Sequence, residues 1–203
     1  MKTTELNNLE KTINSSLAAG VKSSTIRFNQ LTIEVEIEDI NKTILFLKTN
    51  EKCKFRQLID ITAVDYPSNS LRFEIIYILL SMVLNKRVIV KTFLGESEGI
   101  ESITTIHNSA NWYERECYDL FGIQFSNHPD LRRIMTDYNF EGHPLRKDFP
   151  LTGHTEVHYD DLEKKVVYEK VKLDQEYRNF DYSSPWEGFE NQLIGDEKAK
   201  KEN

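Results

Sequence analysis

The stretch LIDITAVDYPSNSLRFEIIYILLSMVLNKRVIVKTFL, residues 58–94, decides the fold. Branched and aromatic residues, which are typical of β-strands, dominate three runs within it: Leu58–Asp65, Leu71–Leu80 and Arg87–Leu94. Turn residues separate these runs at Pro67-Ser68-Asn69 and at Leu84-Asn85-Lys86. The stretch therefore predicts three consecutive strands joined by two tight connections.

The residues before this stretch predict two helices and two further strands. Apolar residues recur at helical spacing from Leu6 to Leu17, and Gly20 ends that pattern. Two strands, 24–28 and 31–37, flank a turn at Asn29-Gln30, and the second alternates apolar and acidic residues. Asp39 is a suitable N-cap for a helix that carries Ile40, Ile44, Leu45 and Leu47.

One more helix is expected after the three strands. It begins near Ser109 and carries Trp112, Tyr113, Cys117, Leu120 and Phe121, and Gly122 suits a left-handed C-terminal position. The element order is α-β-β-α-β-β-β-α. That order predicts an α+β domain over residues 1–125, with helices packed on one face of a mixed sheet.

The sequence pattern changes after Phe125. Residues 131–138 are expected to form one or two helical turns after Pro129, and residues 126–153 otherwise follow neither the helical nor the strand period. Residues 154–190 are acidic and mostly irregular, yet they carry Tyr159, Tyr168, Tyr177, Phe180, Tyr182, Trp186 and Phe189. We expect them to form an extended arm laid on a partner, followed by a disordered tail over 191–203.

The composition restricts the classes of protein to consider. The chain has 203 residues, a net charge of −7 and a hydrophobic content of 39%, and this acidic balance argues against general binding to nucleic-acid phosphates. No apolar run approaches the ~18 residues that cross a bilayer, and the polar N-terminus is unlike a secretory signal. Cys53 and Cys117 are too few for an all-cysteine iron–sulfur cluster and fit a reducing compartment.

A metal site is one alternative for the polar region that follows. Its candidate ligands are His128, His143, His154 and His158, but their spacings of 15, 11 and 4 match no common metal motif. His154 and His158 share a face only in a helix, whereas the alternation around Val157 is that of a strand. The other interpretation is that these imidazoles hydrogen-bond to loop backbone.

Three other groupings have catalytic or binding interpretations. Glu114 and Glu116 are a candidate acid–base pair, but helical residues two apart point to different sides, which favours ion pairs. Cys117 has no histidine nearby in the sequence, so a buried helix cysteine is expected. A phosphate site at the basic residues lacks a glycine-rich loop, and neighbouring acids cancel the field of Arg132, Arg133, Arg146 and Lys147. Such mixed charge favours a protein partner.

A long motif in this region resembles a known family. The stretch ERECYDLFGIQFSNHPDLRRIMTDYNFEGHPLRKDFPLTG, residues 114–153, closely resembles the signature of the C-type or 30 kDa-type subunit of NADH-quinone oxidoreductase, the respiratory complex I. The pattern residues are Glu114, Arg115, Glu116, Asp119, Leu120, Phe121, His128 and Arg132. Met135 and Asn139 are mild departures from it. We call residues 126–153 the signature segment.

The resemblance implies a structural and assembly subunit without a redox centre. The whole enzyme passes electrons from NADH through FMN and iron–sulfur clusters in other subunits to a quinone and couples this to proton pumping. The implied partners are the D-type and B-type subunits of that enzyme, and no cofactor, metal or catalytic residue is expected in this chain. The implied location is peripheral, on the cytoplasmic side of a bacterial inner membrane or on the matrix side of a mitochondrial one. The bacterial case is favoured, since no presequence is evident.

The resemblance also implies where the partner binds. The residues assigned to the partner interface are Glu114, Arg115, Glu116, Asp119, His128, Arg132, Arg133, Asp137, His143, Arg146, Lys147 and Asp148. The basic residues among them are expected to pair with partner acids or with Asp137 and Asp148. Leu131, Leu145, Phe149 and Leu151 are expected to bury beside them.

Three rival functions remain open from the sequence. A homologous subunit of a membrane-bound hydrogenase-type complex is the nearest. A stand-alone metal-dependent enzyme would use the histidines. A nucleic-acid-binding module is disfavoured by the acidic balance and by the lack of a basic aromatic platform.

Overall fold

A computed structural model describes residues 2–17, 20–173 and 175, which divide into a unit ending at Gly153 and a second unit starting at His154. Every long element predicted for residues 1–125 is present. The helices are α1 (Lys2–Ser16), α2 (Ile40–Thr49), α3 (Ala110–Phe121) and a short 3-10 helix, η1 (Ile37–Asp39). The long strands are β1 (Val21–Arg27), β2 (Gln30–Val35), β3 (Gln57–Asp65), β4 (Phe73–Ser81) and β5 (Lys86–Leu94).

The five long strands form one mixed sheet in the order β1-β2-β5-β4-β3. β2 and β5 run parallel, and the other neighbouring pairs run antiparallel. Parallel neighbours need a long connection, and the segment that carries α2, β3 and β4 supplies it between β2 and β5. The predicted mixed sheet is confirmed.

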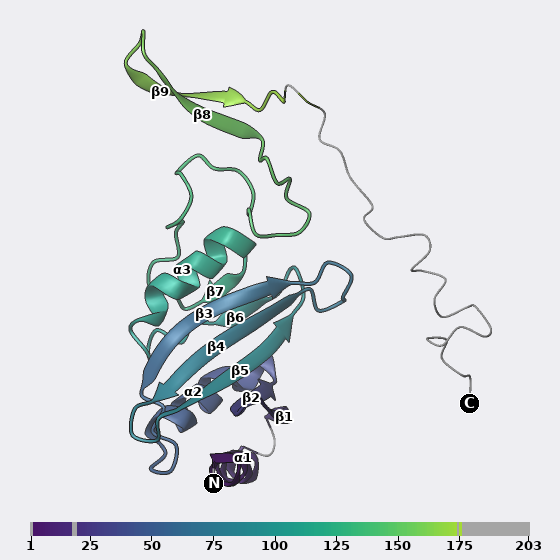
Figure 1. The fold of residues 1–203 in the computed structure, drawn as a ribbon, viewed down its shortest axis with the longest axis vertical. Coiled ribbons are helices and arrows are strands. Elements are labelled where there is room, and N and C mark those ends of the chain that lie inside the picture. Colours follow the sequence, from purple (N-terminus) through teal and green to yellow (C-terminus); the bar gives the residue numbers. More distant parts are fainter. Residues whose placement is uncertain (1, 18–19, 174, 176–203) are drawn as a thin grey trace, which may run out of the picture. The chain divides into compact units, whose positions relative to one another are not determined.

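The helices pack on one face of this sheet, as predicted. In β4, the side chains from Phe73 to Leu79 at alternate positions are buried, whereas Ile76 and Ile78 between them are only partly buried. The buried set shares one core with apolar residues of α1, α2 and α3, and Figure 1 shows α2 passing behind the strands. Burying each such side chain contributes about 1.5–3 kcal/mol to the free energy of unfolding.

Two tight turns lie at the same end of the sheet. The β1–β2 turn places Phe28 and Asn29 in the left-handed region, at φ 49° and 60°, while Arg27 pairs with Gln30. Two successive left-handed residues are characteristic of a type I′ turn, whose twist matches the right-handed twist of the two strands that it joins. The β4–β5 connection has its own left-handed residue, Asn85, at φ 49°. Because β2 and β5 are parallel neighbours, their starting ends, and hence both turns, are adjacent.

Some features differ from the sequence predictions. A short parallel pair, β6 (Gly99–Glu101) and β7 (Gln124–Ser126), was not predicted, because three-residue strands carry almost no periodicity. Asp39 begins α2 as expected, but its carboxylate binds Lys42 instead of the helix backbone. Trp112, one of the residues that the predicted helix carries, is largely exposed on α3.

The described part of the second unit contains a two-stranded antiparallel hairpin. The alternation around Val157 is confirmed as β8 (Thr155–Asp160), and β8 pairs with β9 (Lys165–Lys170), which was expected to be irregular. The predicted arm residues Tyr177, Phe180, Tyr182, Trp186 and Phe189 and the tail over 191–203 lie outside the described residues. Within the part of the chain that is described, no helix is long and apolar enough to cross a membrane.

Candidate functional site

Asp119, near the C-terminal end of α3, organises the signature segment around its buried carboxylate. Its Oδ2 accepts hydrogen bonds from the consecutive backbone N–H groups of Ile134, Met135 and Thr136, at 2.7–3.0 Å. Its Oδ1 accepts one from Arg133 Nη1 at 2.8 Å and one from the Thr136 hydroxyl at 2.6 Å. Five donors from the segment therefore bind one carboxylate.

These bonds also explain why the helical turns predicted over 131–138 do not form. In a helix, the N–H groups at 134–136 would bond to carbonyls four residues earlier, but here they turn to Asp119. Burial opposes ionisation of Asp119, yet the hydrogen bonds from Thr136, Met135 and Ile134 outweigh it and hold the pKa of the carboxyl well below its usual range. The prediction was wrong because a distant carboxylate competes for the same donors.

The charged residues at the start of the signature motif point in different directions from α3. Arg115 donates from Nε to the carbonyl of Arg132 at 3.0 Å and from Nη2 to the carbonyl of Arg133 at 3.1 Å. Glu114 is buried, whereas Glu116 is partly exposed. Side chains two residues apart on a helix point to different sides, as Glu114 and Glu116 do here. This arrangement does not favour an acid–base pair.

Glu114 and His128 meet beneath the start of the signature segment. The Glu114 carboxyl accepts hydrogen bonds from the Ser102 hydroxyl at 2.6 Å and from the N–H of Ile103 at 2.8 Å. His128 Nε2 lies 3.8 Å from Glu114 and donates to the carbonyl of Asn111 at 3.0 Å. Burial raises the pKa of Glu114 to about 7, with both hydrogen bonds opposing that rise. The Glu114 carboxyl therefore gains or loses its proton close to neutral pH.

His143 and Arg146 cover the carbonyl end of α3, where backbone acceptors lack helical partners. His143 Nδ1 donates to the carbonyl of Asp119 at 2.8 Å, and Arg146 Nε donates to the carbonyl of Phe121 at 2.6 Å. Gly122, left-handed at φ 79° as predicted, permits this approach. A Cβ at Gly122 would lie 2.5 Å from Arg146 Nη2 and 2.7 Å from the His143 ring.

A second anchor lies where β3 ends and β4 begins. Arg72 binds Asp65 through two bonds of 2.7 and 3.0 Å, and it also binds Glu96 at 3.0 Å and Asp148 at 2.9 Å. Asp65 accepts a further bond from the N–H of Lys147 at 2.7 Å. The Arg72 guanidinium lowers the pKa of Asp65, and the same bond raises the pKa of Arg72. The pair remains charged throughout the neutral range.

Glu96 joins this anchor to the end of α3. One of its oxygens accepts from Arg72 Nη1 at 3.0 Å and from Arg146 Nη1 at 2.9 Å. Both guanidinium groups also contact the ring of Phe73, at 5.4 and 5.2 Å from its centroid. The sequence analysis missed Asp65, Arg72 and Glu96. Charged residues placed directly at the ends of apolar strands were the available signal.

The structure therefore places the charged signature residues largely in contacts within the chain. The pairs are Arg132 with Asp130, Arg133 with Asp119, Arg146 with Glu96, and Asp148 with Arg72. Lys147 contributes its backbone N–H, and its side chain is exposed, as is that of Asp137. Asp148 was expected to bind one of the signature's own basic residues, but its partner comes from the start of β4.

Apolar side chains occupy much of the outer surface of the signature segment. Tyr138 is 97% exposed and Leu151 86%, and Met135 and Leu145 are also exposed. Leu145 and Leu151, which were expected to be buried at the partner interface, are exposed in this single chain. Phe149 instead stacks on Phe140, at 5.8 Å between ring centroids. The polar side chains of the motif thus fix the conformation of the segment. Its apolar side chains remain exposed at the surface.

The metal and nucleophile interpretations find little support. Among the described residues, no group of three or more His, Cys, Asp or Glu side chains is placed to hold a metal ion. His128 uses both ring nitrogens on backbone groups, since Nδ1 accepts from Asp130, and His143 likewise donates to backbone. Cys117 donates to the carbonyl of Ile61, and burial raises the pKa of its thiol.

Comparison with known proteins agrees with the signature. Residues 33–155 match the family model described as respiratory-chain NADH dehydrogenase, 30 Kd subunit. The chain is 52% identical to the C-type subunit of NADH-quinone oxidoreductase from Hyphomonas neptunium, over 98% of this chain and 99% of that protein. It is 53% identical to the corresponding subunit from Chelativorans sp., over 96% and 98% of the two chains.

A solved structure extends the likeness to another respiratory assembly. A chain in the structure of the membrane-bound sulfane sulfur reductase, an archaeal respiratory membrane complex, is 25% identical. It matches with a TM-score of 0.62 over 71% of this chain and 85% of that one. The much higher identity to the bacterial NADH-quinone oxidoreductase proteins decides between the two groups. The chain therefore belongs to the 30 kDa subunit family of the respiratory-chain NADH dehydrogenase, as a C-type subunit of NADH-quinone oxidoreductase.

Proposed function

We propose that this chain is a non-redox structural and assembly subunit in the peripheral arm of proton-pumping NADH:quinone oxidoreductase, docking on the D-type subunit close to the B-type subunit and the quinone-reducing module. Electrons would pass from NADH to quinone through FMN and iron–sulfur centres in those other subunits. The chain itself contributes no catalytic residue, metal or cofactor. It would lie on the cytoplasmic side of the bacterial inner membrane, held there through the complex.

One observation carries this proposal. The polar residues of the signature segment are bound to α3, to β4 and to one another, so the segment has a set shape before any partner arrives. The segment nevertheless leaves four large apolar side chains exposed, namely Met135, Tyr138, Leu145 and Leu151. Exposed apolar side chains on a pre-shaped segment mark a protein-binding surface and lower the ordering cost of association.

The second unit supports a further contact. Its hairpin, β8 and β9, exposes Val157, Tyr159, Val166 and Tyr168 at its surface. A two-stranded hairpin is marginally stable alone, so contact with a partner would stabilise it. We assign residues 154–190 to an arm that lies on the D-type subunit.

A related respiratory complex is the second candidate, favoured by the archaeal sulfane sulfur reductase structure. In that case the same docking surface would serve a complex with a different electron donor, such as a membrane-bound hydrogenase-type enzyme. The identity of 52% to a bacterial NADH-quinone oxidoreductase subunit over nearly the whole chain favours the NADH enzyme.

The test is affinity purification of the tagged full chain from gently solubilised membranes, followed by mass spectrometry and an NADH:quinone activity assay. Recovery of the D-type and B-type subunits with inhibitor-sensitive activity supports the proposal. Recovery of hydrogenase subunits instead supports the second candidate, and recovery of the chain alone contradicts both.

Substitutions at the surface make the test specific. Tyr138→Asp and Leu145→Asp place charge in the apolar surface without removing an anchor, and each should reduce recovery of the D-type subunit about tenfold or more. Leu45→Asp is the matched control, since Leu45 is also an exposed leucine but lies on α2. Equal recovery from all three variants would rule out this surface as the docking site.

A further inference from the structure

A second apolar surface lies at the opposite end of the sheet from the signature segment. It comprises the β1–β2 turn and the β4–β5 turn, where Phe28 is fully exposed and Met82 and Val83 are 74% and 71% exposed. Both turns adjoin the start of β5. Glu96 comes just after the end of β5, and Arg72 lies beside that end because the next residue, Phe73, pairs with Leu94. Nine extended residues separate these ends by roughly 30 Å. We call this surface the turn patch.

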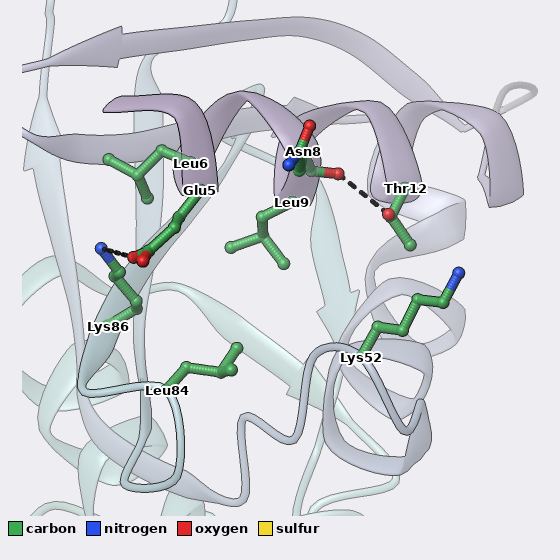
Figure 2. Close-up of a pocket in the computed structure, with 8 residues that line it drawn as sticks. All are labelled: Glu5, Leu6, Asn8, Leu9, Thr12, Lys52, Leu84 and Lys86. Atoms are coloured by element: carbon green, nitrogen blue, oxygen red, sulfur yellow. Dashed lines mark hydrogen bonds and ion pairs between the residues drawn. The ribbon is translucent and has the colours of Figure 1, made fainter. Parts of the chain in front are cut away.

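Two hollows flank the turn patch. One, of about 430 Å³, lies between the two turns and has a mixed lining of Phe28, Leu80 and Met82 with Asn29, Gln30, Asn85, Lys86 and Arg87. The other, of about 270 Å³, lies between α1 and the β4–β5 turn. Figure 2 shows Leu6 and Leu9 of α1 directed into this second hollow, with Leu84 across from them. Each hollow has room for a large apolar side chain of another segment.

The charges around the turn patch are predominantly basic. Lys52, Lys86 and Arg87 line the two hollows, and Glu5 is the acid among the lining residues. Glu5 is neutralised by Lys86 at 3.0 Å, a contact that Figure 2 also shows. Lys52 and Arg87 have no ion pair within the part of the chain described here. This basic rim stands out in a chain whose net charge is −7.

We propose that the turn patch is a second assembly surface, which binds an acidic segment with large apolar side chains from another subunit of the same complex. The mainly apolar hollow beside α1 and the exposed side chains of Phe28, Met82 and Val83 contact the anchoring side chains, and Lys52 and Arg87 attract the flanking carboxylates. The inference rests on the chain's membership of a multi-subunit complex but uses none of the residues assigned to the docking surface for the D-type subunit.

Charge argues against a second copy of this chain as the occupant. In a symmetric pair the same patch faces itself, so Arg87 and Lys52 would approach like charges in an apolar setting. An acidic partner instead neutralises them. The chain's own residues 176–203 are acidic and contain aromatic residues, so the test has to distinguish them from another subunit.

The test is site-specific photocross-linking in the assembled complex. The full chain carries p-benzoylphenylalanine at Val83, with a second version carrying it at Tyr138 as a report on the signature segment. Mass spectrometry then identifies the cross-linked residues. The proposal requires that Val83 cross-links to one segment of another subunit in which large apolar residues are interspersed with Asp or Glu.

A charge variant makes the readout specific. In the Val83 version, Arg87→Glu should lower the cross-linked yield about tenfold, whereas Arg87→Lys should retain most of it. Arg87 is exposed, so neither change disturbs the core.

Four results would overturn the proposal: a cross-link to residues 174–203 of the same chain, one to a second copy, one to a segment without acids, or none at all. If the Tyr138 version gave no cross-link while the Val83 version gave the expected one, that result would contradict docking on the D-type subunit but would support the proposal for the turn patch.

Discussion

The backbone N–H of Lys147 donates a 2.7 Å hydrogen bond to Oδ2 of Asp65, a residue 82 positions earlier in the chain. The carboxylate of Asp119 likewise accepts hydrogen bonds from backbone N–H groups in the middle of the signature segment. Two buried carboxylates of the folded domain thus bind backbone groups of a segment that forms no helix or strand. These backbone bonds act beside the side-chain bonds of Arg133, Thr136 and Arg146, and they fix the path of the segment without involving its exposed apolar side chains.

Replacing the Asp119 carboxylate should release the centre of the signature segment. Asp119→Asn leaves five donors facing an uncharged amide, and we expect the free energy of unfolding at pH 7 to fall by about 3–5 kcal/mol. Hydrogen exchange should become faster at the N–H groups of Ile134, Met135 and Thr136. Exchange at these three positions that stays as slow as in the unmodified chain would contradict the assigned role.

The same variant has a predictable pH dependence. The folded-state pKa of Asp119 is depressed, so its stabilising contribution is present above the unfolded pKa of roughly 4 and is lost as pH falls below that value. The stability difference between the unmodified chain and Asp119→Asn should therefore shrink between about pH 4 and pH 2. Denaturant titrations at several pH values measure it.

Glu114 should show the opposite dependence. Its folded-state pKa is raised to about 7, so its contribution is fully present below the unfolded pKa of roughly 4.3 and is lost as pH rises through 7. Glu114→Gln, which cannot ionise, should lose less stability between pH 5 and pH 8 than the unmodified chain, by up to about 3 kcal/mol. Parallel unfolding curves for the two proteins across that range would contradict the buried-acid assignment.

Gly122 should not tolerate a side chain. Gly122→Ala combines a left-handed φ of 79° with a Cβ placed 2.5 Å from Arg146, so we expect a loss of about 1–2 kcal/mol and faster hydrogen exchange over residues 143–149. Gly95→Ala is the control. At Gly95 the nearest atom to an added Cβ is 3.4 Å away on the flexible side chain of Glu98. If both variants behave alike, close packing at Gly122 is not the reason for its presence.

Arg146 should matter for assembly more than for any chemical step. Arg146→Ala removes the bond to the Phe121 carbonyl and the pair with Glu96, at a cost of about 2 kcal/mol, and frees the end of the signature segment. The amount of intact complex on native gels should fall, while activity per assembled complex stays the same. Arg56→Ala is the matched control, because the Arg56 side chain is also an arginine but is exposed and lies outside the signature segment.

Sequence reasoning succeeded for elements defined by local pattern. The alternation over Ile33, Val35 and their neighbours, the two hairpins of residues 58–94 and the glycine after α3 each depend on residues a few positions apart, and all are confirmed. It failed where distant residues decide. Leu131 to Tyr138 resembles a helix locally, but Asp119 takes the N–H groups that the helix would need.

The site shows the same division. The motif identified the family and most of the charged positions around Asp119, but it did not reveal which charges bind each other. Arg72 and Glu96 lie outside the motif, and only the sheet brings them to Arg146 and Asp148. The resemblance also implied that the leucines would be buried at the interface, beside basic residues paired with partner acids or with Asp137 and Asp148. Within this chain Arg133 and Arg146 instead bind Asp119 and Glu96, and Leu145 and Leu151 are exposed, as expected of side chains that become buried only against a partner.

The bond between Lys147 and Asp65 also orders events during synthesis. Asp65 is made long before Lys147, and the bond cannot close until the ribosome has released the chain beyond residue 147. Long-range contacts of this kind form late, because the intervening chain must first be organised. A chain truncated before Lys147 thus lacks the anchored surface that a partner would recognise, so such a product should not join the complex.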